Sequence, residues 1–562
     1  MQRRLAYASG AGPGLLGTTV GDTLRDTTRK WGNQDALVVC SEGVKWSYTE
    51  LLQRAETVAS GLVALGLPKQ ARIGIYGPNS SEWVVTQMAA SLADLVLVNI
   101  NPAYQVVELK HALSKVQVAA VIMATGFKSS NYVDLMMTTV PELRNASSTT
   151  IASAELPDLK HCLLIGSAKQ KGFMNFDDLY KLGSGKNEEY ETRTSNVNFE
   201  DPTNIQFTSG TTGAPKAATL THHNIVNNGY HVGETLNYSP DDRVCIPVPL
   251  YHCFGMVLGN LACITHGSCI VLPGHAFDPV ETMDAVENER VTSLYGVPTM
   301  FMANLKEHER KPRKVGTLRT GIVACAICPP PLMKSIVDTL GISEMTNCYG
   351  MTETAPVSFQ LPRDSTLEQK TSSVGVVAPH VEAKIVDPVS GEIVHRGKSG
   401  ELQVRGYLVM DGYWGDQKAT ADAITHQGWM RTGDLANMTD DGYVSIVGRC
   451  KDVIIRGGEN ISPSEVEHFL ITHPRIEDVH IFGVPDDVLG EQVAAWIRLK
   501  NNGNNDTLTL AEIKEFCHGK VAHFKIPSVV KIVDEFPMTV TGKVMKFKMR
   551  EIHLSNNKGG KE

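Results

Sequence analysis

The stretch Phe207-Thr-Ser-Gly-Thr-Thr-Gly-Ala-Pro-Lys-Ala-Ala-Thr219 carries the strongest indication of fold and chemistry in the chain. Hydroxyl and backbone N–H groups donate hydrogen bonds to an anion, glycine lets the backbone approach it closely, and lysine adds a positive charge. The apolar residues 205–207 are typical of a strand end, so we expect a phosphate-binding loop at the edge of an α/β sheet. The residues of this loop are Thr208, Ser209, Gly210, Thr211, Thr212, Gly213, Ala214, Pro215 and Lys216.

Two other interpretations compete with this one. A Ser/Thr/Gly cluster between regular segments is commonly an ordinary loop, but the lysine, the proline and the preceding strand favour anion binding. The second is the nucleotide-binding loop G-x-x-x-x-G-K-[ST], whose spacing Gly210 and Lys216 share. Pro215 replaces its second glycine and Ala217 its hydroxyl residue. Because no hydroxyl is placed there to hold magnesium, an ordinary P-loop NTPase is disfavoured.

The overall composition describes a large protein of ordinary globular character. A chain of 562 residues exceeds what one hydrophobic core organises, so we expect at least two domains. The net charge of −8 argues against nucleic acid or a membrane surface as a partner. No apolar run reaches the ~18 residues of a membrane-spanning helix. We therefore expect no nucleic-acid partner and no integral membrane segment; the small-molecule substrates are implied by the resemblance described below.

The cysteines and the chain ends say little about function. Eleven dispersed cysteines suggest a reducing compartment, and the pair in Cys325-Ala-Ile-Cys328 has no second pair at zinc-site spacing, so we expect it to be packed. The segment Met1-Gln-Arg-Arg-Leu5 is basic but does not have the pattern of a signal peptide, and the last three residues are not a peroxisomal signal.

Helices and strands alternate through the first two thirds of the chain. In residues 20–124, Ser47 and Glu50 have the spacing of a capping box that opens a helix, and residues 73–76, 95–99 and 118–123 read as strands. The alternation resumes from residue 268 to residue 349, while residues 184–200 read as a polar connection with little structure. Alternating elements predict right-handed crossovers and doubly wound, mostly parallel sheets.

Beyond residue 374 the pattern changes to short alternating strands separated by turns, which predicts a small barrel or an antiparallel sheet. The last part of the chain reads as an α+β unit with a helix over residues 463–470. We place the boundary between a large domain of residues 1–448 and a small C-terminal domain of residues 449–562, with Lys451 at the hinge.

Five further stretches carry chemically useful residues. Together they suit a nucleotide: an aromatic ring to stack on a base, one carboxylate for ribose hydroxyls and another for magnesium, and cationic side chains for phosphates. No single stretch is specific for nucleotide binding, but all five in this order indicate it. They are Leu250-Tyr-His-Cys-Phe-Gly255, Tyr349-Gly-Met-Thr-Glu353, Thr432-Gly-Asp434, Gly448-Arg449 and Thr541-Gly-Lys543.

At this point the chain resembles the adenylate-forming superfamily of acyl-CoA synthetases, luciferases and adenylation domains. The resemblance extends over residues 20–550 and is strongest to mitochondrial medium-chain acyl-CoA synthetases. It also rests on the stretches Asn101-Pro-Ala-Tyr104, Asn204-Ile-Gln-Phe207, Tyr295-Gly-Val-Pro-Thr-Met-Phe301, Ile455-Arg-Gly-Gly-Glu-Asn-Ile461 and His523-Phe-Lys-Ile-Pro527.

The resemblance implies a ligase of fatty acid metabolism that uses ATP, CoA and Mg²⁺, in a mitochondrial or otherwise cytoplasmic compartment. A medium-chain fatty acid attacks the α-phosphate of ATP, which gives an acyl-adenylate and pyrophosphate, and the CoA thiol then displaces AMP. AMP is a far better leaving group than oxide, so the enzyme needs positioning and charge neutralisation more than a protein nucleophile.

The same resemblance implies a role for each motif residue. The loop from Thr208 to Lys216 holds the triphosphate, and a small mobile domain exchanges a lysine for a glycine loop between the two steps. The remaining roles are Tyr349 on adenine, Asp434 and Arg449 on ribose, Thr352 on the α-phosphate, Glu353 on magnesium, Lys543 on the carboxylate and α-phosphate, His252 beside the acyl and CoA channel, and Gly457 and Gly458 along the CoA tunnel.

Two residues depart from the superfamily pattern. Ala217 follows the loop lysine where glycine is usual, and its methyl group either is tolerated or crowds the loop. Cys325 stands where relatives have a glycine, and a positive φ there would cost about 1 kcal/mol or more. Two alternatives remain. The enzyme delivers the acyl group to a carrier arm or to oxygen, or the chain is a nucleotide-binding protein without activity. The presence of the motif residues argues against both.

Overall fold

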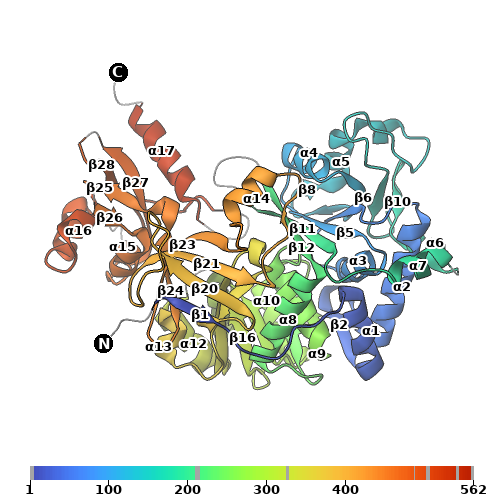
Figure 1. Cartoon of the computed structure of the whole chain (residues 1–562), viewed down its shortest axis with the longest axis horizontal. Coiled ribbons are helices and arrows are strands. Elements are labelled where there is room, and N and C mark those ends of the chain that lie inside the picture. Colours follow the sequence, from blue (N-terminus) through green and yellow to red (C-terminus); the bar gives the residue numbers. More distant parts are fainter. Residues whose placement is uncertain are drawn as a thin grey trace. The chain divides into compact units, whose positions relative to one another are not determined.

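The computed structural model describes residues 5–185, 187–208, 215–324, 328–457, 459–486, 488–500, 507–538 and 544–558. The chain divides into two compact units (Figure 1). The larger comprises Ala8–Ala383 and Val404–Met430, and the smaller comprises Met1–Tyr7, Lys384–Gln403 and Arg431–Glu562. Among the described residues, no helix has both the length and the apolar character needed to cross a membrane.

The larger unit contains an eight-stranded sheet that ends in the strands on either side of the phosphate loop. It is parallel from β10 to β11, while β12 is antiparallel to β11 and β22 is antiparallel to β12. The strand order is β10 (Met174–Asn175), β9 (His161–Leu164), β6 (Val118–Met123), β4 (Arg72–Tyr76), β5 (Val96–Ile100), β11 (Pro202–Thr208), β12 (Lys216–Thr221) and β22 (Gly412–Tyr413).

A nine-stranded sheet forms the second half of the larger unit. Its strands are parallel from β17 to β2, while β18 is antiparallel to β17, β19 is antiparallel to β18, and β3 is antiparallel to β2. The order is β19 (Val376–Val377), β18 (Val357–Gln360), β17 (Glu344–Gly350), β16 (Thr320–Val323), β15 (Ser293–Gly296), β13 (Arg243–Cys245), β14 (Cys269–Leu272), β2 (Asp35–Val39) and β3 (Val44–Ser47).

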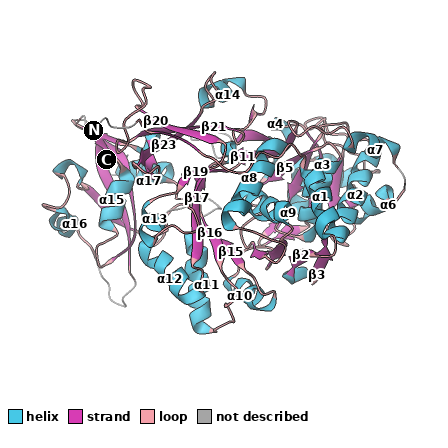
Figure 2. Cartoon of the chain, turned by 60° about the horizontal axis from the view of Figure 1, so that its bottom comes forward, coloured by secondary structure: helices cyan, strands magenta, loops and turns pink. Residues whose placement is uncertain are grey.

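One group of helices contacts strands of both sheets. Helix α8 touches β11 and β12 of the first sheet and β18 of the second, while α3 packs on β4 and β5 and α2 packs on β2 and β3 (Figure 2). This layer consists of α1 (Val20–Trp31), α2 (Tyr48–Ala64), α3 (Ser81–Leu92), α8 (His222–Leu236), the π-helix η3 (Phe254–Leu261) and α9 (Ala262–His266). The doubly wound α/β organisation predicted from the alternating elements is confirmed.

Other helices of the larger unit also pack on the second sheet: α10 contacts β13, and α11 contacts β15. The helices outside the layer that joins both sheets are α4 (Val106–Lys115), α5 (Tyr132–Thr139), α6 (Asp177–Gly183), α7 (Glu188–Thr194), α10 (Pro279–Asn288), α11 (Pro298–Arg310), α12 (Pro330–Leu340), α13 (Leu367–Ser372) and α14 (Gln417–Ala423), with a short hairpin of β7 (Gly126–Phe127) and β8 (Ser130–Asn131).

Local sequence signals explain where several helices begin. Ser47 and Glu50 form the predicted capping box at the start of α2. Ser80 accepts a hydrogen bond from the Trp83 N–H and so caps α3. The prediction of little structure in residues 184–200 is wrong, because α7 forms there. Asn187 caps α7, and the buried Arg193 pairs with Glu189 at 2.7 Å within the same helix.

A five-stranded sheet follows the point where the pattern of the sequence changes, and its strands contribute to both units. The order is β1 (Tyr7–Ser9), β20 (Val381–Val386), β21 (Gly400–Gly406), β23 (Met430–Met438) and β24 (Val444–Arg449).

The rest of the smaller unit is the predicted α+β arrangement. Its sheet has the order β26 (Glu459–Ile461), β25 (Ile454–Arg456), β28 (Gly490–Leu499) and β27 (Ile476–Asp486), and β29 (Val529–Ile532) pairs with β28. Its helices are α15 (Pro463–Leu470), which has the bounds predicted from the sequence, α16 (Leu510–Cys517) and α17 (Lys546–Lys558).

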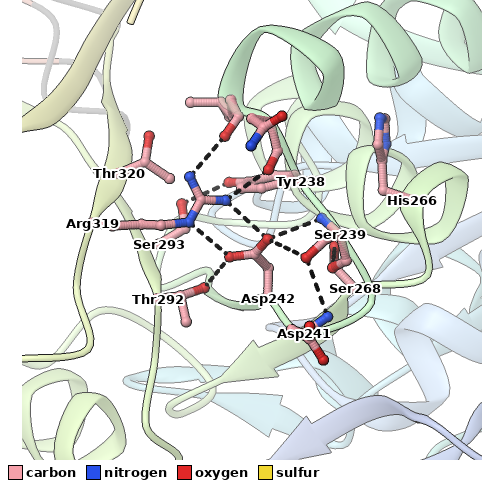
Figure 3. A network of polar contacts seen from close by, with 12 residues as sticks. Tyr238, Ser239, Asp241, Asp242, His266, Ser268, Thr292, Ser293, Arg319 and Thr320 are labelled. Atoms are coloured by element: carbon pink, nitrogen blue, oxygen red, sulfur yellow. Dashed lines mark hydrogen bonds and ion pairs between the residues drawn. The ribbon is translucent and has the colours of Figure 1, made fainter.

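A buried ionic network joins the C-terminal end of α8 to three strands of the second sheet (Figure 3). The Asp242 carboxylate, 4% exposed, accepts hydrogen bonds from Thr292 Oγ1 at 2.7 Å and from Arg319 Nε and Nη2 at 3.1 and 2.9 Å. Arg319 also donates to the carbonyls of Leu236 and Asn237 at 3.0 and 2.9 Å. The network satisfies carbonyl groups at the helix end, which otherwise lack partners.

We expect Asp242→Ala to lower the thermal unfolding midpoint by several degrees, because it leaves the Arg319 guanidinium without its principal counter-charge. Removing one partner of a fully buried ion pair costs about 3–5 kcal/mol, and we expect the lower end here because the Arg319 side chain is 31% exposed and also pairs with Glu344 at 3.2 Å. The matched control is Asp338→Ala, since Lys334 and Asp338 form a pair at 2.6 Å whose side chains are 65% and 56% exposed. Exposed pairs contribute about 0–1 kcal/mol. Equal midpoints for the two variants would contradict a structural role of the network.

Candidate nucleotide site

The two ends of the phosphate loop are cross-strand neighbours. Thr208 is the last residue of β11, Lys216 is the first residue of β12, and the two pair in antiparallel register. The strand end predicted before the loop is therefore confirmed. Residues 209–214 lie outside the described residues, so the predicted phosphate ligands Ser209, Gly210, Thr211, Thr212, Gly213 and Ala214 stay predictions.

Glu353 lies next to the start of this loop. It belongs to the 3₁₀ turn η4 (Thr352–Thr354), and its side chain is 6% exposed. Its Oε1 accepts hydrogen bonds from Thr208 Oγ1 at 3.1 Å and from the Tyr413 hydroxyl at 2.8 Å. Buried carboxylates require such partners, because an isolated charge in a protein interior is costly.

Tyr413 links this carboxylate to the lysine of the loop. The strand β22 that carries it pairs with β12, where Tyr413 lies opposite Ala218. The Lys216 ammonium lies 4.8 Å from the centroid of its ring. Burial raises the pKa of the Tyr413 hydroxyl, and the Glu353 charge raises it further, so the hydroxyl remains a donor. The sequence showed only the turn at Asp411-Gly412 and gave no reason to select the tyrosine after it.

The arrangement suits a magnesium ion bound together with nucleotide phosphates. Magnesium is usually held by one or two carboxylates plus substrate phosphates. Glu353 supplies one carboxylate beside the loop, and both of its hydrogen bonds above fall on Oε1. The described residues contain no group of three or more His, Cys, Asp and Glu side chains that would bind a metal without a substrate.

Tyr349 and Thr352 belong to the same segment as Glu353. Tyr349 is half-buried near the end of β17, and its ring centroid lies 6.2 Å from that of Phe359. Gly350 follows, and a Cβ there would lie 1.7 Å from the Pro356 carbonyl oxygen, so the close approach of β17 to β18 requires glycine. The structure therefore brings Tyr349, Thr352, Glu353, Thr208 and Lys216 into one unit.

His252 precedes the apolar helix that starts at Phe254. Its carbonyl accepts hydrogen bonds from the N–H groups of Gly255 and Met256 at 3.1 and 2.9 Å, and its ring lies 4.1 Å from that of Tyr251. The helix that follows is η3, a π-helix, which the sequence did not indicate. Wider turns of this type are frequent at functional sites.

A ladder of buried amides connects β5 to β11 and was not recognised from the sequence. Asn204 Nδ2 donates to Asn99 Oδ1 at 3.0 Å, and Gln206 Nε2 donates to Asn204 Oδ1 at 3.0 Å. Asn99 Nδ2 reaches the carbonyl of Tyr251 at 3.0 Å. The ladder holds the residue before His252 against the strand that leads into the phosphate loop, so it acts by positioning.

The smaller unit contains the residues predicted to hold ribose. Asp434 and Arg449 are directly paired in the register of β23 and β24, and Arg449 Nε lies 3.3 Å from Asp434 Oδ1. Thr432 Oγ1 accepts a hydrogen bond from the Asp434 N–H at 3.1 Å and donates to the Leu402 carbonyl at 2.7 Å. A carboxylate and a guanidinium from two distant motifs thus lie on adjacent strands.

The predicted hinge and glycine loop also lie in the smaller unit. Lys451 is in the 3₁₀ turn η5 (Cys450–Asp452) that follows β24. Gly457 has a φ of 59°, a conformation that favours glycine, and its N–H donates to the Leu489 carbonyl at 2.7 Å. Gly458 and Lys543 lie outside the described residues, so their roles stay predictions.

One of the two departures from the superfamily pattern has a structural explanation. Ala217 lies opposite Phe207 in β12, and its methyl group is fully buried in the hydrophobic core of the first sheet. The methyl group is therefore packed in this core. Cys325 lies outside the described residues. Cys328 is buried, which raises the pKa of its thiol to about 12 and agrees with a packing role.

The fold and the motifs define an adenylate-forming enzyme. Residues 24–414 match the AMP-binding enzyme family, and residues 465–543 match the C-terminal domain of AMP-binding enzymes. The chain belongs to the AMP-binding enzyme family.

Among its relatives is the mitochondrial medium-chain acyl-CoA ligase ACSF2 of Danio rerio, which is 43% identical over 96% of this chain and 88% of its own. The putative acyl-CoA synthetase YngI of Bacillus subtilis is 40% identical over 96% of this chain and 97% of its own. The solved structure of ATP-bound MatB from Rhodopseudomonas palustris superimposes with a TM-score of 0.82 at 27% identity, covering 96% of this chain and 99% of that one.

We expect Tyr413→Phe to lower the affinity for ATP in the presence of Mg²⁺ by about tenfold, because a hydrogen bond to a charged group contributes about 1.5–3 kcal/mol. The measurement is titration calorimetry. Tyr180→Phe is the control, since the Tyr180 hydroxyl in α6 contacts Arg54 instead. Unchanged affinity in Tyr413→Phe would show that the Glu353 contact does not serve nucleotide binding.

Proposed function

We propose that the chain activates a medium-chain fatty acid with ATP and transfers the acyl group to CoA, giving acyl-CoA, AMP and pyrophosphate. The observation that carries this proposal is the placement of Glu353 against both Thr208 at the loop and Tyr413 beside Lys216. Relatives at 40–43% identity over nearly the whole chain are named as acyl-CoA ligases, which supports a thioester product. The ACSF2 relatives support a medium-chain acid.

In the first step the fatty acid carboxylate attacks the α-phosphate of ATP. Lys216 and the hydroxyl-rich loop neutralise the outer phosphates, while Thr352 and Lys543 neutralise the charge that develops at the α-phosphate. Tyr349 stacks on the adenine ring, and Asp434 and Arg449 hold the ribose hydroxyls. Glu353 would hold magnesium together with the phosphates, and the bound ion would supply further charge neutralisation.

In the second step the CoA thiol attacks the acyl-adenylate. We propose that the domain boundary lies between residues 448 and 449 and that rotation at Lys451 replaces Lys543 with the glycines Gly457 and Gly458. The glycine loop admits the pantetheine arm because it presents little side-chain bulk, and His252 borders the channel where acyl group and thiol meet. One active site thereby serves two successive reactions.

The proposed compartment is the mitochondrion, by similarity to ACSF2, although the bacterial relative shows that the family is not confined to it. Expression of the chain with a C-terminal fluorescent tag tests this assignment, and a diffuse cytosolic signal would contradict it.

The function itself is tested by measuring pyrophosphate release across a series of carboxylic acids, with and without CoA. We expect the highest kcat/KM for acids of medium length and an acyl-CoA product when CoA is present. Pyrophosphate release without any acyl-CoA would favour delivery to another acceptor.

We expect Lys543→Ala to reduce adenylate formation by about a thousandfold, because an electrostatic contact to the transition state contributes about 3–4 kcal/mol. The same variant should convert supplied acyl-adenylate and CoA into acyl-CoA at a near-normal rate, since the lysine has left the site by then. Lys520→Ala, on the turn after α16, is the control. Equal losses in both half-reactions would contradict the rotation of the small domain.

We expect Gly457→Leu to leave pyrophosphate release within about twofold and to slow acyl-CoA formation at least tenfold, because a side chain would obstruct the pantetheine arm. Gly519→Leu is a matched control, since Gly457 and Gly519 have φ angles of 59° and 71° and carry similar backbone strain. Loss of both half-reactions in Gly457→Leu alone would contradict the assignment of this loop to CoA.

A further inference from the structure

The smaller unit contains an ion pair that the sequence motifs did not indicate, between Glu467 in α15 and Lys546 at the start of α17. The Lys546 ammonium lies 2.7 Å from Glu467 Oε1, and the two side chains are 20% and 18% exposed. Both residues belong to one compact unit. Partly buried pairs are screened by salt much less than exposed pairs, so this contact is a firmer constraint than an ordinary surface ion pair.

The Glu467 carboxylate is itself held by the neighbouring sheet. Its Oε1 accepts a hydrogen bond from the Ile481 N–H in β27 at 2.7 Å, and His480 Nδ1 lies 3.8 Å from the same oxygen. Helix α15 also packs on β27. Hydrogen bonds to an ionised acceptor are stronger than those between neutral groups. Glu467 therefore offers Lys546 a counter-charge whose position is fixed by the backbone of a strand.

Helix α17 packs on β27 and is held at two points one turn apart (Figure 1). Four residues after Lys546, Arg550 Nη1 lies 3.0 Å from Glu491 Oε1 in β28. Residues four apart lie on the same side of a helix. Between them, Met549 is fully buried in a core cluster that includes Phe482. Two ionic contacts and a buried side chain oppose both sliding of the helix and rotation about its axis.

The chain that leads into α17 is anchored as well. Met538 and Val544 form an antiparallel bridge. Residues 539–543 connect the two partners of this bridge and lie outside the described residues. In the sequence Lys543 directly precedes Val544, and Lys546 follows it by three positions. The described anchor points nearest to the proposed catalytic lysine are therefore this bridge and the ion pair at the start of α17.

We propose that Glu467 is a positioning residue for adenylate formation. Its charge holds Lys546, which fixes the first turn of α17, and that turn sets the direction in which Lys543 enters the site. This inference rests on the proposed function, in which Lys543 neutralises charge at the α-phosphate, and it adds the group that orients the lysine. Such stabilisation depends on groups that are fixed before the reaction, and a misplacement of about 1 Å can cost about a hundredfold in rate.

The contribution of Glu467 is confined to the first step. In the proposed function Lys543 has left the site when CoA attacks, so its orientation no longer affects the rate. The glycine loop has an anchor of its own, because the Gly457 N–H donates to the Leu489 carbonyl at 2.7 Å. Removing the charge of Glu467 therefore leaves this anchor of the glycine loop in place.

The test measures the two half-reactions separately in Glu467→Gln, which keeps an acceptor for the Ile481 N–H and removes the charge. We expect kcat for pyrophosphate release to fall about tenfold, while KM for ATP and acyl transfer from supplied acyl-adenylate stay within about twofold. Lys546→Met should give the same loss. The double variant should lose no more than either single variant, because both substitutions remove one interaction.

Combination with Lys543→Ala identifies the residue through which Glu467 acts. If Glu467 acts by orienting Lys543, Glu467→Gln adds no further loss of pyrophosphate release to Lys543→Ala. A further loss of about tenfold in this double variant would overturn the inference. Equal losses of both half-reactions in Glu467→Gln would also overturn it, because they are the result expected of a merely structural role.

Two controls alter the same sheet and the same helix. Glu477→Gln removes a carboxylate of β27 that is 49% exposed and lies 3.3 Å from Arg498, and Lys548→Met removes an exposed cation of α17. Both should keep the two half-reactions within about twofold, and a tenfold loss in either would contradict a specific role of the Glu467 pair.

Failure of this inference differs from failure of the proposed function. Normal pyrophosphate release in Glu467→Gln, together with the expected loss in Lys543→Ala, would overturn the inference and leave the role of the lysine intact. Normal release in Lys543→Ala would instead contradict the proposed function of that lysine.

Discussion

The buried carboxylate of Glu353 is the constraint on which the proposed catalytic unit depends. A charge that is 6% exposed needs partners, and its side chain takes them from two chain segments far apart in sequence: Thr208 at the end of β11 and Tyr413 in β22. The Glu353 carbonyl also accepts a hydrogen bond from the Met410 N–H at 3.0 Å. Satisfying one carboxylate therefore fixes the entrance of the phosphate loop, the segment that begins at Tyr349 and the edge strand of the first sheet.

The segments that contact Glu353 can meet because one layer of helices packs against both sheets. Helix α8 starts directly after β12, touches the first sheet, and reaches β18 of the second. Its beginning is set by Thr221 and Asn224, which form a capping box, and its end by the network around Asp242 and Arg319. Both ends of the helix that contacts the two sheets are therefore held by side-chain hydrogen bonds.

Local signals in the sequence predicted much of this structure. The capping box at Ser47 and the helix Pro463–Leu470 follow from short-range patterns, whereas the pairing of Asp434 with Arg449 was not predicted and their ribose roles stay predictions. The missed features depend on contacts between distant segments. In the sequence Tyr413 is only an aromatic residue after a turn, and its position beside the loop lysine depends on the pairing of β22 with β12. The amide ladder through Asn204 likewise requires β5 to lie beside β11. Helix α7 was missed because its polar composition resembles that of a loop.

Acyl-chain length is a property that no nucleotide motif encodes. In the proposed function the segment from Tyr349 to Glu353 meets the reactive end of the substrate, and Glu353 is held there by its hydrogen bonds to Thr208 and Tyr413. These contacts depend on the residues of the nucleotide motifs and place no constraint on the far end of the acid. Relatives can therefore keep every nucleotide motif and still differ in the acids that they accept.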